Sequence, residues 1–109
     1  MEAFEKKLYD AIFEYLSETM TDESADEQAR NLVGQIIELN TTITYMVEAN
    51  ETDTGLLSKK YHTLKNLLLY GDFYYESDLC QDIEEKLRET KNTSSILEMH
   101  SELQSSLLM

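Results

Sequence analysis

Residues 54–70 read TGLLSKKYHTLKNLLLY, and apolar side chains recur in this stretch at intervals of three and four residues. Because 3.6 residues make one turn of an α-helix, such spacing places the apolar side chains on a single face. The side chains that form this stripe are Leu57, Tyr61, Leu64 and Leu68. The stretch therefore predicts an amphipathic helix that runs up to about Tyr70 and buries the stripe in a core.

Turn-forming residues bound this helix on both sides. The preceding residues 50–55 read NETDTG, in which Asp53 or Thr54 is available as the N-cap. After the helix come Gly71, a typical C-terminal stop, and Asp72, which we expect to cap the next helix. Both connections are short, so the neighbouring helices are expected to run antiparallel to this one.

The same helical period recurs over the rest of the chain, and strand signals are absent. There is no proline, and only three residues are glycine. Capping boxes, in which two side chains satisfy each other's free backbone N–H groups, are predicted by Ser24 with Glu27 and by Ser95 with Glu98. The additional helices are expected over residues 2–19, from 24 to about 49, from 72 to about 90, and from 95 onward.

One apolar stripe on each helix and short connections predict an all-α fold. The expected architecture is an antiparallel up-down four-helix bundle with one additional N-terminal helix. The sequence contains no internal repeat, no low-complexity tract and no sign of a second domain. Residues 1–109 are therefore expected to form a single helical domain.

Charge and composition exclude several classes of function. The chain has 22 acidic and 9 basic side chains, a net charge of −13, whereas binding to nucleic acid or anionic lipid needs clustered Lys and Arg. There is no run of about 18 apolar residues and no signal-peptide core, so we expect a cytoplasmic protein without a membrane span. The single cysteine, Cys80, excludes an internal disulfide and a cysteine-cluster metal site.

Few residues carry candidate chemistry. His62 and His100 fall on different helices without the His–Glu spacings of metal sites, and we expect neither a metal nor a cofactor. Cys80 is expected to be a buried thiol on the apolar side of its helix. The seven tyrosines are expected to pack in the bundle with their hydroxyls at the rim. Three acidic pairs are expected on solvated helix faces: Asp22-Glu23, Asp26-Glu27 and Glu84-Glu85.

His62 stands out because of its placement on its helix. Side chains three and four positions away are its surface neighbours, and all of them are polar. These neighbours are Ser58, Lys59, Lys65 and Asn66. We therefore expect His62 to face solvent in mid-helix, with a lysine one turn before it and another one turn after it.

The charge around His62 also differs from that of the rest of the chain. Residues 51–70 contain three lysines against two acidic residues, a net charge of +1, so the remaining residues carry −14. Nearby ammonium groups favour a neutral, nucleophilic imidazole, and they stabilise a phosphoryl dianion attached to it. This arrangement suits phosphoryl chemistry. The alternative is a surface histidine that lies among lysines without a chemical role.

The string Tyr61-His62-Thr63-Leu64-Lys65 resembles the phosphorylation-site motif of histidine-containing phosphotransfer (HPt) domains, which reads roughly Ala-His-x-Leu-Lys-Gly. Downstream, Leu79, Cys80, Ile83 and Glu84 resemble the apolar-Cys-x-x-apolar-Glu helix of that family. The resemblance covers about residues 28–90. It implies a four-helix bundle, often with an extra helix, that relays a phosphoryl group between aspartates of receiver domains or takes it from a kinase.

The resemblance assigns roles to individual residues. His62 would be the phosphoacceptor, Lys65 would steady the phosphoryl group, and Lys59 occupies a flanking position that is often basic in the family. The family's glycine four residues after the histidine is Asn66 here, and a side chain at this position would restrict how a receiver approaches. Leu69 would contribute to the apolar surface on which a receiver docks.

Two further departures from the family pattern lie beyond Asn66. The small residues that usually follow are Leu67, Leu68 and Leu69, which indicates tighter core packing or an apolar docking surface. The helix-ending glycine, Gly71, comes one residue early.

The resemblance also implies the partners. They are the receiver domain of a response regulator, a histidine kinase, or both, and neither nucleic acid nor a membrane is expected. The receiver would supply Mg²⁺ and the catalytic aspartates. We therefore expect a monomeric phosphoryl carrier rather than an enzyme in the usual sense.

Other functions are open on the sequence alone. An acidic helical adaptor or inhibitor would bind a basic partner through the −14 surface. A degenerate HPt domain would bind receivers without being phosphorylated. An enzyme that acts on small molecules ranks third, because no second catalytic group can be paired with His62.

Overall fold

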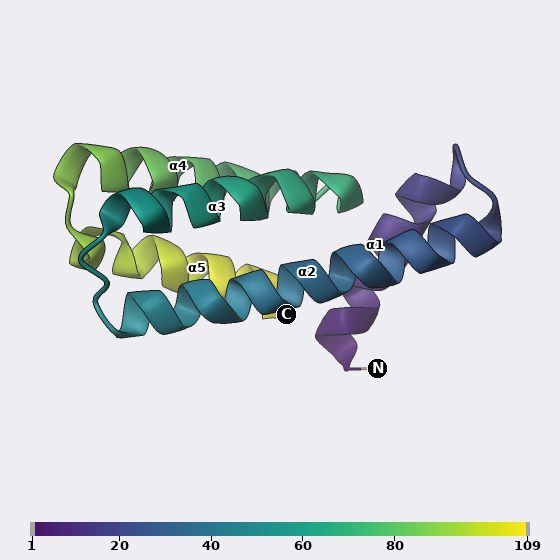
Figure 1. Ribbon diagram of the computed structural model, residues 1–109, viewed down its shortest axis with the longest axis horizontal. Coiled ribbons are helices and arrows are strands. Elements are labelled where there is room, and N and C mark those ends of the chain that lie inside the picture. The colour runs from purple at the N-terminus through teal and green to yellow at the C-terminus, as the bar shows by residue number, and fades with distance from the viewer. Residues whose placement is uncertain (1, 109) are drawn as a thin grey trace.

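The computed structural model describes residues 2–108, which form five α-helices and two 3₁₀ turns (Figure 1). Over these residues there is no β-strand, so the prediction of an all-α fold is confirmed. None of the helices described is long and apolar enough to cross a bilayer. The α-helices are α1 (Ala3–Ser17), α2 (Asp22–Glu48), α3 (Thr54–Leu68), α4 (Tyr74–Thr90) and α5 (Leu97–Leu108), and the 3₁₀ turns are η1 (Leu69–Gly71) and η2 (Thr93–Ile96).

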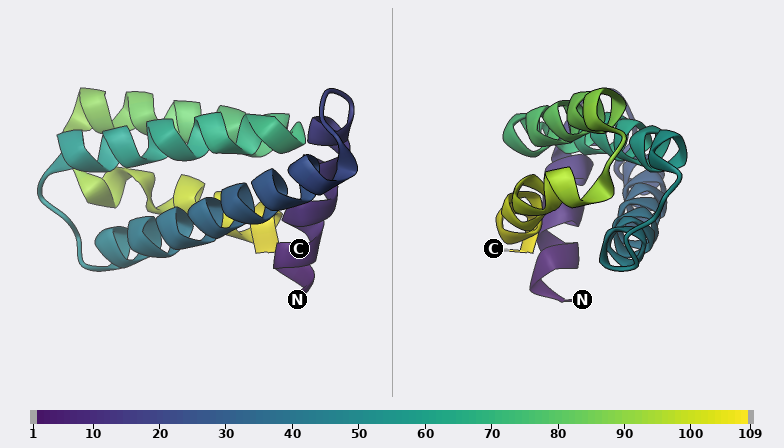
Figure 2. Two further views of the ribbon diagram at one scale, coloured as in Figure 1. Left: turned by 45° about the vertical axis from the view of Figure 1, so that its right-hand side comes forward. Right: turned by 90° about the vertical axis from the view of Figure 1, so that its left-hand side faces the viewer.

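Helices α2 to α5 run in alternating directions along the long axis of the molecule, and α1 crosses near one end (Figures 1 and 2). α3 packs along α4, α2 packs against α1 and α3, and α5 packs against α4. α1 also contacts η1, where the chain passes from α3 into α4. α1, which is distant from α3 in the sequence, therefore packs at the C-terminal end of α3.

The stripe predicted in residues 54–70 lies at the centre of the core. Its four side chains, Leu57, Tyr61, Leu64 and Leu68, have no exposed area. Tyr61 belongs to this inward stripe, whereas the next residue, His62, is exposed. Every helix adds fully buried side chains to this core: Leu8, Ile12, Ala25, Ala29, Ile36, Ile43, Cys80, Ile83, Leu87, Leu103 and Leu107.

Polar contacts inside the molecule join α5 to α2 and α3. Asn40 and Gln104 form a reciprocal pair, in which each side-chain amide donates to the other's oxygen at 2.9 and 2.8 Å. The buried His100 has its Nδ1 2.7 Å from the Tyr61 hydroxyl and its Nε2 3.3 Å from the Thr44 hydroxyl. Protein hydroxyls thus satisfy both ring nitrogens of His100, as buried polar groups require.

Both predicted capping boxes are wrong. α2 begins two residues before Ser24, and its N-cap is Thr21, whose hydroxyl accepts a hydrogen bond from the Ser24 N–H at 3.2 Å. At the last connection the chain first forms η2, where Asn92 accepts from the Ser94 N–H at 3.0 Å, and α5 begins only at Leu97. In each case a polar residue nearer the N-terminus starts the helical hydrogen bonding earlier than the box predicts.

The end of α3 also differs from the prediction in its details. The α-helix ends at Leu68 and tightens into η1, and the left-handed residue is Asp72, with φ 58°, rather than Gly71. The N-cap of α4 is Phe73, which makes no side-chain capping bond. Gly71 is required for another reason: a Cβ there would lie 2.5 Å from the Phe73 ring and 3.3 Å from Ile12. Close packing, and not backbone conformation, accounts for this glycine.

The tyrosines do not pack as predicted. Only Tyr61 is fully buried, and Tyr45 on α2 is 74% exposed. The other tyrosines with large exposed areas are Tyr15, Tyr70, Tyr74 and Tyr75.

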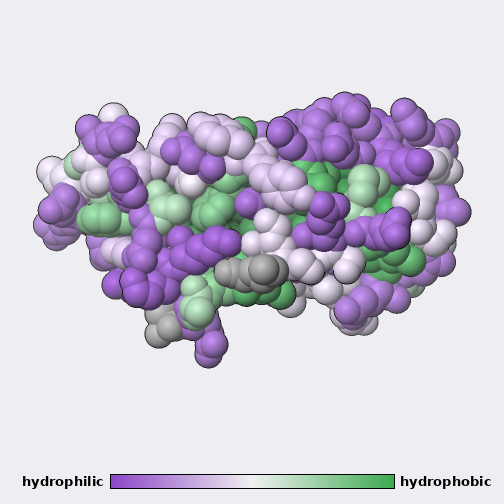
Figure 3. Space-filling model, turned by 180° about the vertical axis from the view of Figure 1, so that it is seen from behind, coloured by the Kyte–Doolittle hydropathy of each residue, from purple (hydrophilic) through white to green (hydrophobic). Residues whose placement is uncertain are grey.

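The surface seen from behind is largely hydrophilic, with apolar side chains visible between the hydrophilic ones (Figure 3).

Alanine should have opposite effects at two of the glycines. At Gly34, on the exposed face of α2, a Cβ meets no atom within 4 Å, so Gly34→Ala should raise the free energy of unfolding by about 0.5–1 kcal/mol. Gly71→Ala should lower it by about 1–3 kcal/mol, because the methyl group must displace the buried Phe73 ring. Urea unfolding followed by circular dichroism measures both, and effects of the same sign would contradict this packing.

Candidate functional site

His62 lies in the middle of α3, and its side chain is 52% exposed. Its neighbour Tyr61 is fully buried, and adjacent residues of an α-helix point about 100° apart. With the Tyr61 side chain directed into the core, His62 is exposed, as the helical pattern predicts.

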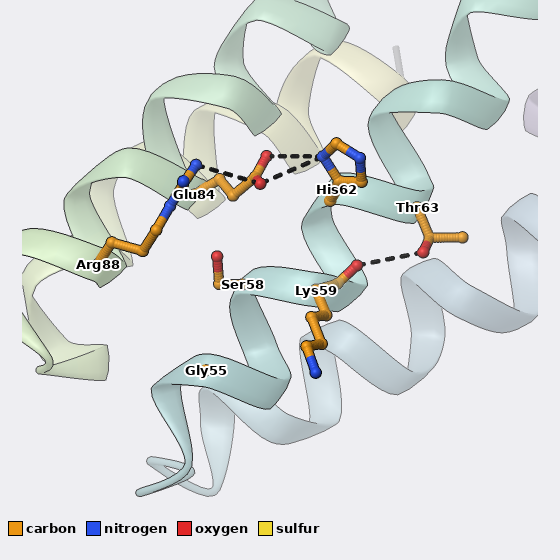
Figure 4. Close-up of a pocket in the computed structure, with 7 residues that line it drawn as sticks. All are labelled: Gly55, Ser58, Lys59, His62, Thr63, Glu84 and Arg88. Atoms are coloured by element: carbon orange, nitrogen blue, oxygen red, sulfur yellow. Dashed lines mark hydrogen bonds and ion pairs between the residues drawn. The ribbon is translucent and has the colours of Figure 1, made fainter.

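The charged group that contacts the imidazole is a carboxylate. The Nδ1 atom of His62 lies 3.2 and 3.4 Å from the two carboxylate oxygens of Glu84 on α4 (Figure 4). Glu84 is buried, so its predicted place on a solvated helix face is wrong, whereas Glu85 is exposed. The cause is the packing of α3 on α4, which turns the residue after the buried Ile83 towards α3.

Glu84 also contacts two other bases. The Arg88 Nη2 atom lies 3.2 Å from one carboxylate oxygen, and the Lys65 Nζ atom lies 4.0 Å from the other. The nearly buried Glu84 carboxylate is stabilised by the positive charges of Arg88 and Lys65 and by its hydrogen bonds. These contacts offset the hydration that the carboxylate loses on burial. Glu84 thereby links α3 to α4 directly beneath the exposed imidazole.

The two predicted lysines are placed differently. The Lys65 side chain is only 18% exposed, and its ammonium group donates to the Gln81 Oε1 atom at 2.7 Å. Lys59 is exposed, and its ammonium group points away from the His62 ring (Figure 4). Neither ammonium group touches the imidazole, so the environment of His62 is not the one predicted from the lysines alone.

A surface pocket of about 610 Å³ lies between α3 and α4 beside His62 (Figure 4). Its lining combines side chains of α3 with two of α4: Gly55, Ser58, Lys59, His62, Thr63, Glu84 and Arg88. Sequence reasoning missed Ser58 and Arg88 as parts of a site. The only available signal for Arg88 was its spacing four residues after Glu84, which is typical of a helical ion pair.

The predicted binding residues Asn66 and Leu69 lie together in a second, smaller pocket. Its volume is about 280 Å³, and Tyr15 and Tyr70 complete its lining. The rings of these two tyrosines meet edge to face with centroids 6.2 Å apart. Tyr15 comes from α1, and sequence reasoning missed it because nothing local indicates that α1 reaches η1.

One other candidate, Cys80, is buried in the core. Cys80 has no exposed area, and burial raises the pKa of its thiol to about 12, so the thiol is protonated at neutral pH. This confirms the prediction of a buried thiol. Within residues 2–108, no group of three or more His, Cys, Asp or Glu side chains is arranged to hold a metal ion.

Comparison with protein-family models, with curated proteins and with solved structures finds no match for this chain. The geometry around His62 and the motif that surrounds it are therefore the features that point to a function.

The second histidine should make the folding stability depend on pH. Burial lowers the pKa of His100 below its ordinary value of 6.5, and the nearby Glu48 carboxylate only partly opposes this shift. The unfolded chain therefore takes up a proton at a pH where the folded chain does not. The contribution of His100 to the free energy of unfolding is therefore complete above about pH 6.5. It is lost as the pH falls towards the lowered pKa of His100 in the folded state.

Chemical denaturation between about pH 7.5 and about pH 5.5 tests this effect, whose slope is at most about 1.4 kcal/mol per pH unit. The free energy of unfolding of the wild type should fall more steeply than that of His100→Gln, which has no imidazole at this position. Equal slopes in the two proteins would show that His100 is not the group responsible.

Proposed function

We propose that this chain is a histidine phosphotransfer protein, in which Nε2 of His62 accepts a phosphoryl group from an aspartate of a receiver domain and returns it. One observation carries the proposal. The imidazole is half exposed, its Nδ1 atom is held by the nearly buried Glu84 carboxylate, and its Nε2 atom has no hydrogen-bond partner among the residues described.

The contact with Glu84 suits a nucleophilic ring nitrogen. When Nδ1–H donates to the carboxylate, the neutral imidazole carries its lone pair on Nε2. This lone pair attacks the phosphorus of an aspartyl phosphate: the N–P bond forms, the O–P bond breaks, and the aspartate leaves as a carboxylate. The ring becomes positively charged in this step, and the Glu84 carboxylate stabilises that charge across the Nδ1–H bond.

The fold supplies further support. We propose that α2 to α5 form an antiparallel up-down four-helix bundle, with α1 as the additional N-terminal helix. The supporting contacts are those of α3 with α2 and α4, of α4 with α5, and the amide pair that joins α5 to α2. This is the architecture that the resemblance to HPt domains implies.

The surroundings of His62 suggest how a receiver docks. Asn66 and Leu69 follow His62 along α3 and η1, and the pocket that they share with Tyr15 and Tyr70 offers apolar contacts beside the imidazole. Transient signalling interfaces combine such a modest apolar patch with a polar rim. Lys65 would steady the phosphoryl group after its flexible side chain exchanges Gln81 for the phosphoryl oxygens.

A second candidate is a protein that binds its partner without phosphotransfer, either a degenerate HPt domain or an acidic adaptor or inhibitor. Two observations favour it. Asn66 occupies the place of the family glycine, and Lys65 is engaged by Gln81. The net charge of −13 would then attract a basic partner, and the complex would weaken steeply with ionic strength.

Transfer from phosphorylated receiver domains and histidine kinases tests the proposal. The wild type should acquire acid-labile phosphate, whereas His62→Gln should acquire none, because the only other imidazole in the sequence is buried. Lys86→Gln changes an exposed side chain of α4 outside the pocket, so it should be labelled like the wild type. A wild type that no donor labels, or equal labelling of His62→Gln, would overturn phosphotransfer, and a pull-down over a salt series would then distinguish the two binding-only alternatives.

Glu84 should control the rate of transfer. Glu84→Gln keeps an acceptor for the Nδ1–H group but removes the negative charge, so transfer should slow by about 10- to 100-fold, the usual cost of losing such an orienting partner. Lys65→Ala should weaken transfer without abolishing it. Single-turnover kinetics with one labelled receiver measures both rates, and an unchanged rate in Glu84→Gln would show that the carboxylate serves only the packing of α3 on α4.

A further inference from the structure

The pocket between α3 and α4 contains a hydroxyl that makes no hydrogen bond to any residue that the structure describes. Ser58 is only 6% exposed, and its hydroxyl makes no hydrogen bond within residues 2–108. In Figure 4 the Oγ atom points from α3 into the space below Glu84 and Arg88. The hydroxyl faces the open space of the pocket and is therefore free to donate a hydrogen bond to a ligand atom there.

Arg88 supplies donors from the opposite wall of the same pocket. Its side chain is 61% exposed, and one guanidinium nitrogen, Nη2, contacts Glu84 at 3.2 Å. A guanidinium group carries five N–H donors, and the others have no partner in the described part of the chain. Arg88 can therefore bind an anion while it keeps its contact with Glu84.

The charge of the pocket also favours an anion. Arg88 and Lys59 bring two positive charges to its lining, against the one carboxylate of Glu84. That carboxylate also lies 4.0 Å from the Lys65 ammonium group, a positive charge outside the lining that partly offsets its own. A local excess of positive charge is unusual in a chain whose net charge is −13.

We propose that this pocket binds a tetrahedral oxyanion, either inorganic phosphate or the phosphate group of a monoester, between the Arg88 guanidinium and the Ser58 hydroxyl. Donors on two opposite walls match the four oxygens of a phosphate better than the two coplanar oxygens of a carboxylate. The site is separate from the phosphorylated nitrogen proposed above, because Nε2 of His62 points away from Glu84 and Arg88 (Figure 4). The inference therefore does not depend on phosphotransfer.

Titration of the full chain with inorganic phosphate, followed by NMR at constant ionic strength, tests this site. Amide signals of residues 55–63 and 84–88 should shift and saturate at millimolar phosphate. Arg88→Gln should weaken binding at least tenfold, as expected for a charge-assisted contact, and Ser58→Ala should weaken it several-fold. Lys86→Gln removes the same charge from α4 outside the pocket, and it should bind like the wild type.

Further arms of the titration identify the ligand. Phenyl phosphate that binds more tightly than inorganic phosphate would identify a monoester as the ligand, and the reverse order would identify free phosphate. Acetate should bind at least tenfold more weakly than either, and equal binding of acetate would overturn the preference for a tetrahedral anion. Equal losses in Arg88→Gln and Lys86→Gln, or shifts spread over the whole surface, would overturn the site. Because no receiver is present, these results are independent of whether His62 is phosphorylated.

Discussion

The packing of α3 along α4 is the constraint on which the rest of the structure depends. The buried stripe of α3 fixes the rotation of this helix about its own axis. A rotation by one residue would expose Tyr61 and carry His62 into the core, where its imidazole would need new hydrogen-bond partners. The position of the candidate nucleophile is thus set by an apolar neighbour. The rotation of α4, fixed by Ile83, sets the position of Glu84 in the same way.

Much of this fold can be predicted from the sequence because the information is local and periodic. The stripe in residues 54–70, the exposure of His62 and the burial of Cys80 all follow from a period of 3.6 residues. Helix starts are harder to predict. Thr21 and Ser24 both suit an N-cap, and the choice between them depends on where the helix first meets the core, which the local sequence does not encode.

The part of the site that could not be predicted depends on contacts between distant segments. Glu84 and Glu85 are chemically identical neighbours, yet only Glu84 faces α3, because the relative rotation of two helices decides between them. The same holds for Tyr15, which reaches the Asn66 pocket only because α1 packs against η1. Sequence reasoning therefore identified the imidazole but not the groups that hold it and line its surroundings.

The amide pair between Asn40 and Gln104 has a consequence for how α5 finds its place. α5 is only 12 residues long, and it would reach another position along its neighbours by sliding one turn. Two reciprocal hydrogen bonds form at only one such position, and a shift would strand two partly buried amides without partners. A pair of leucines would remove these two hydrogen bonds, and only the contacts of His100 with Tyr61 and Thr44 would then join α5 to α3 and α2 by hydrogen bonds among the residues described. The pair thus ties the position of α5 to both side chains, and substitutions at either residue are expected to be tolerated only together.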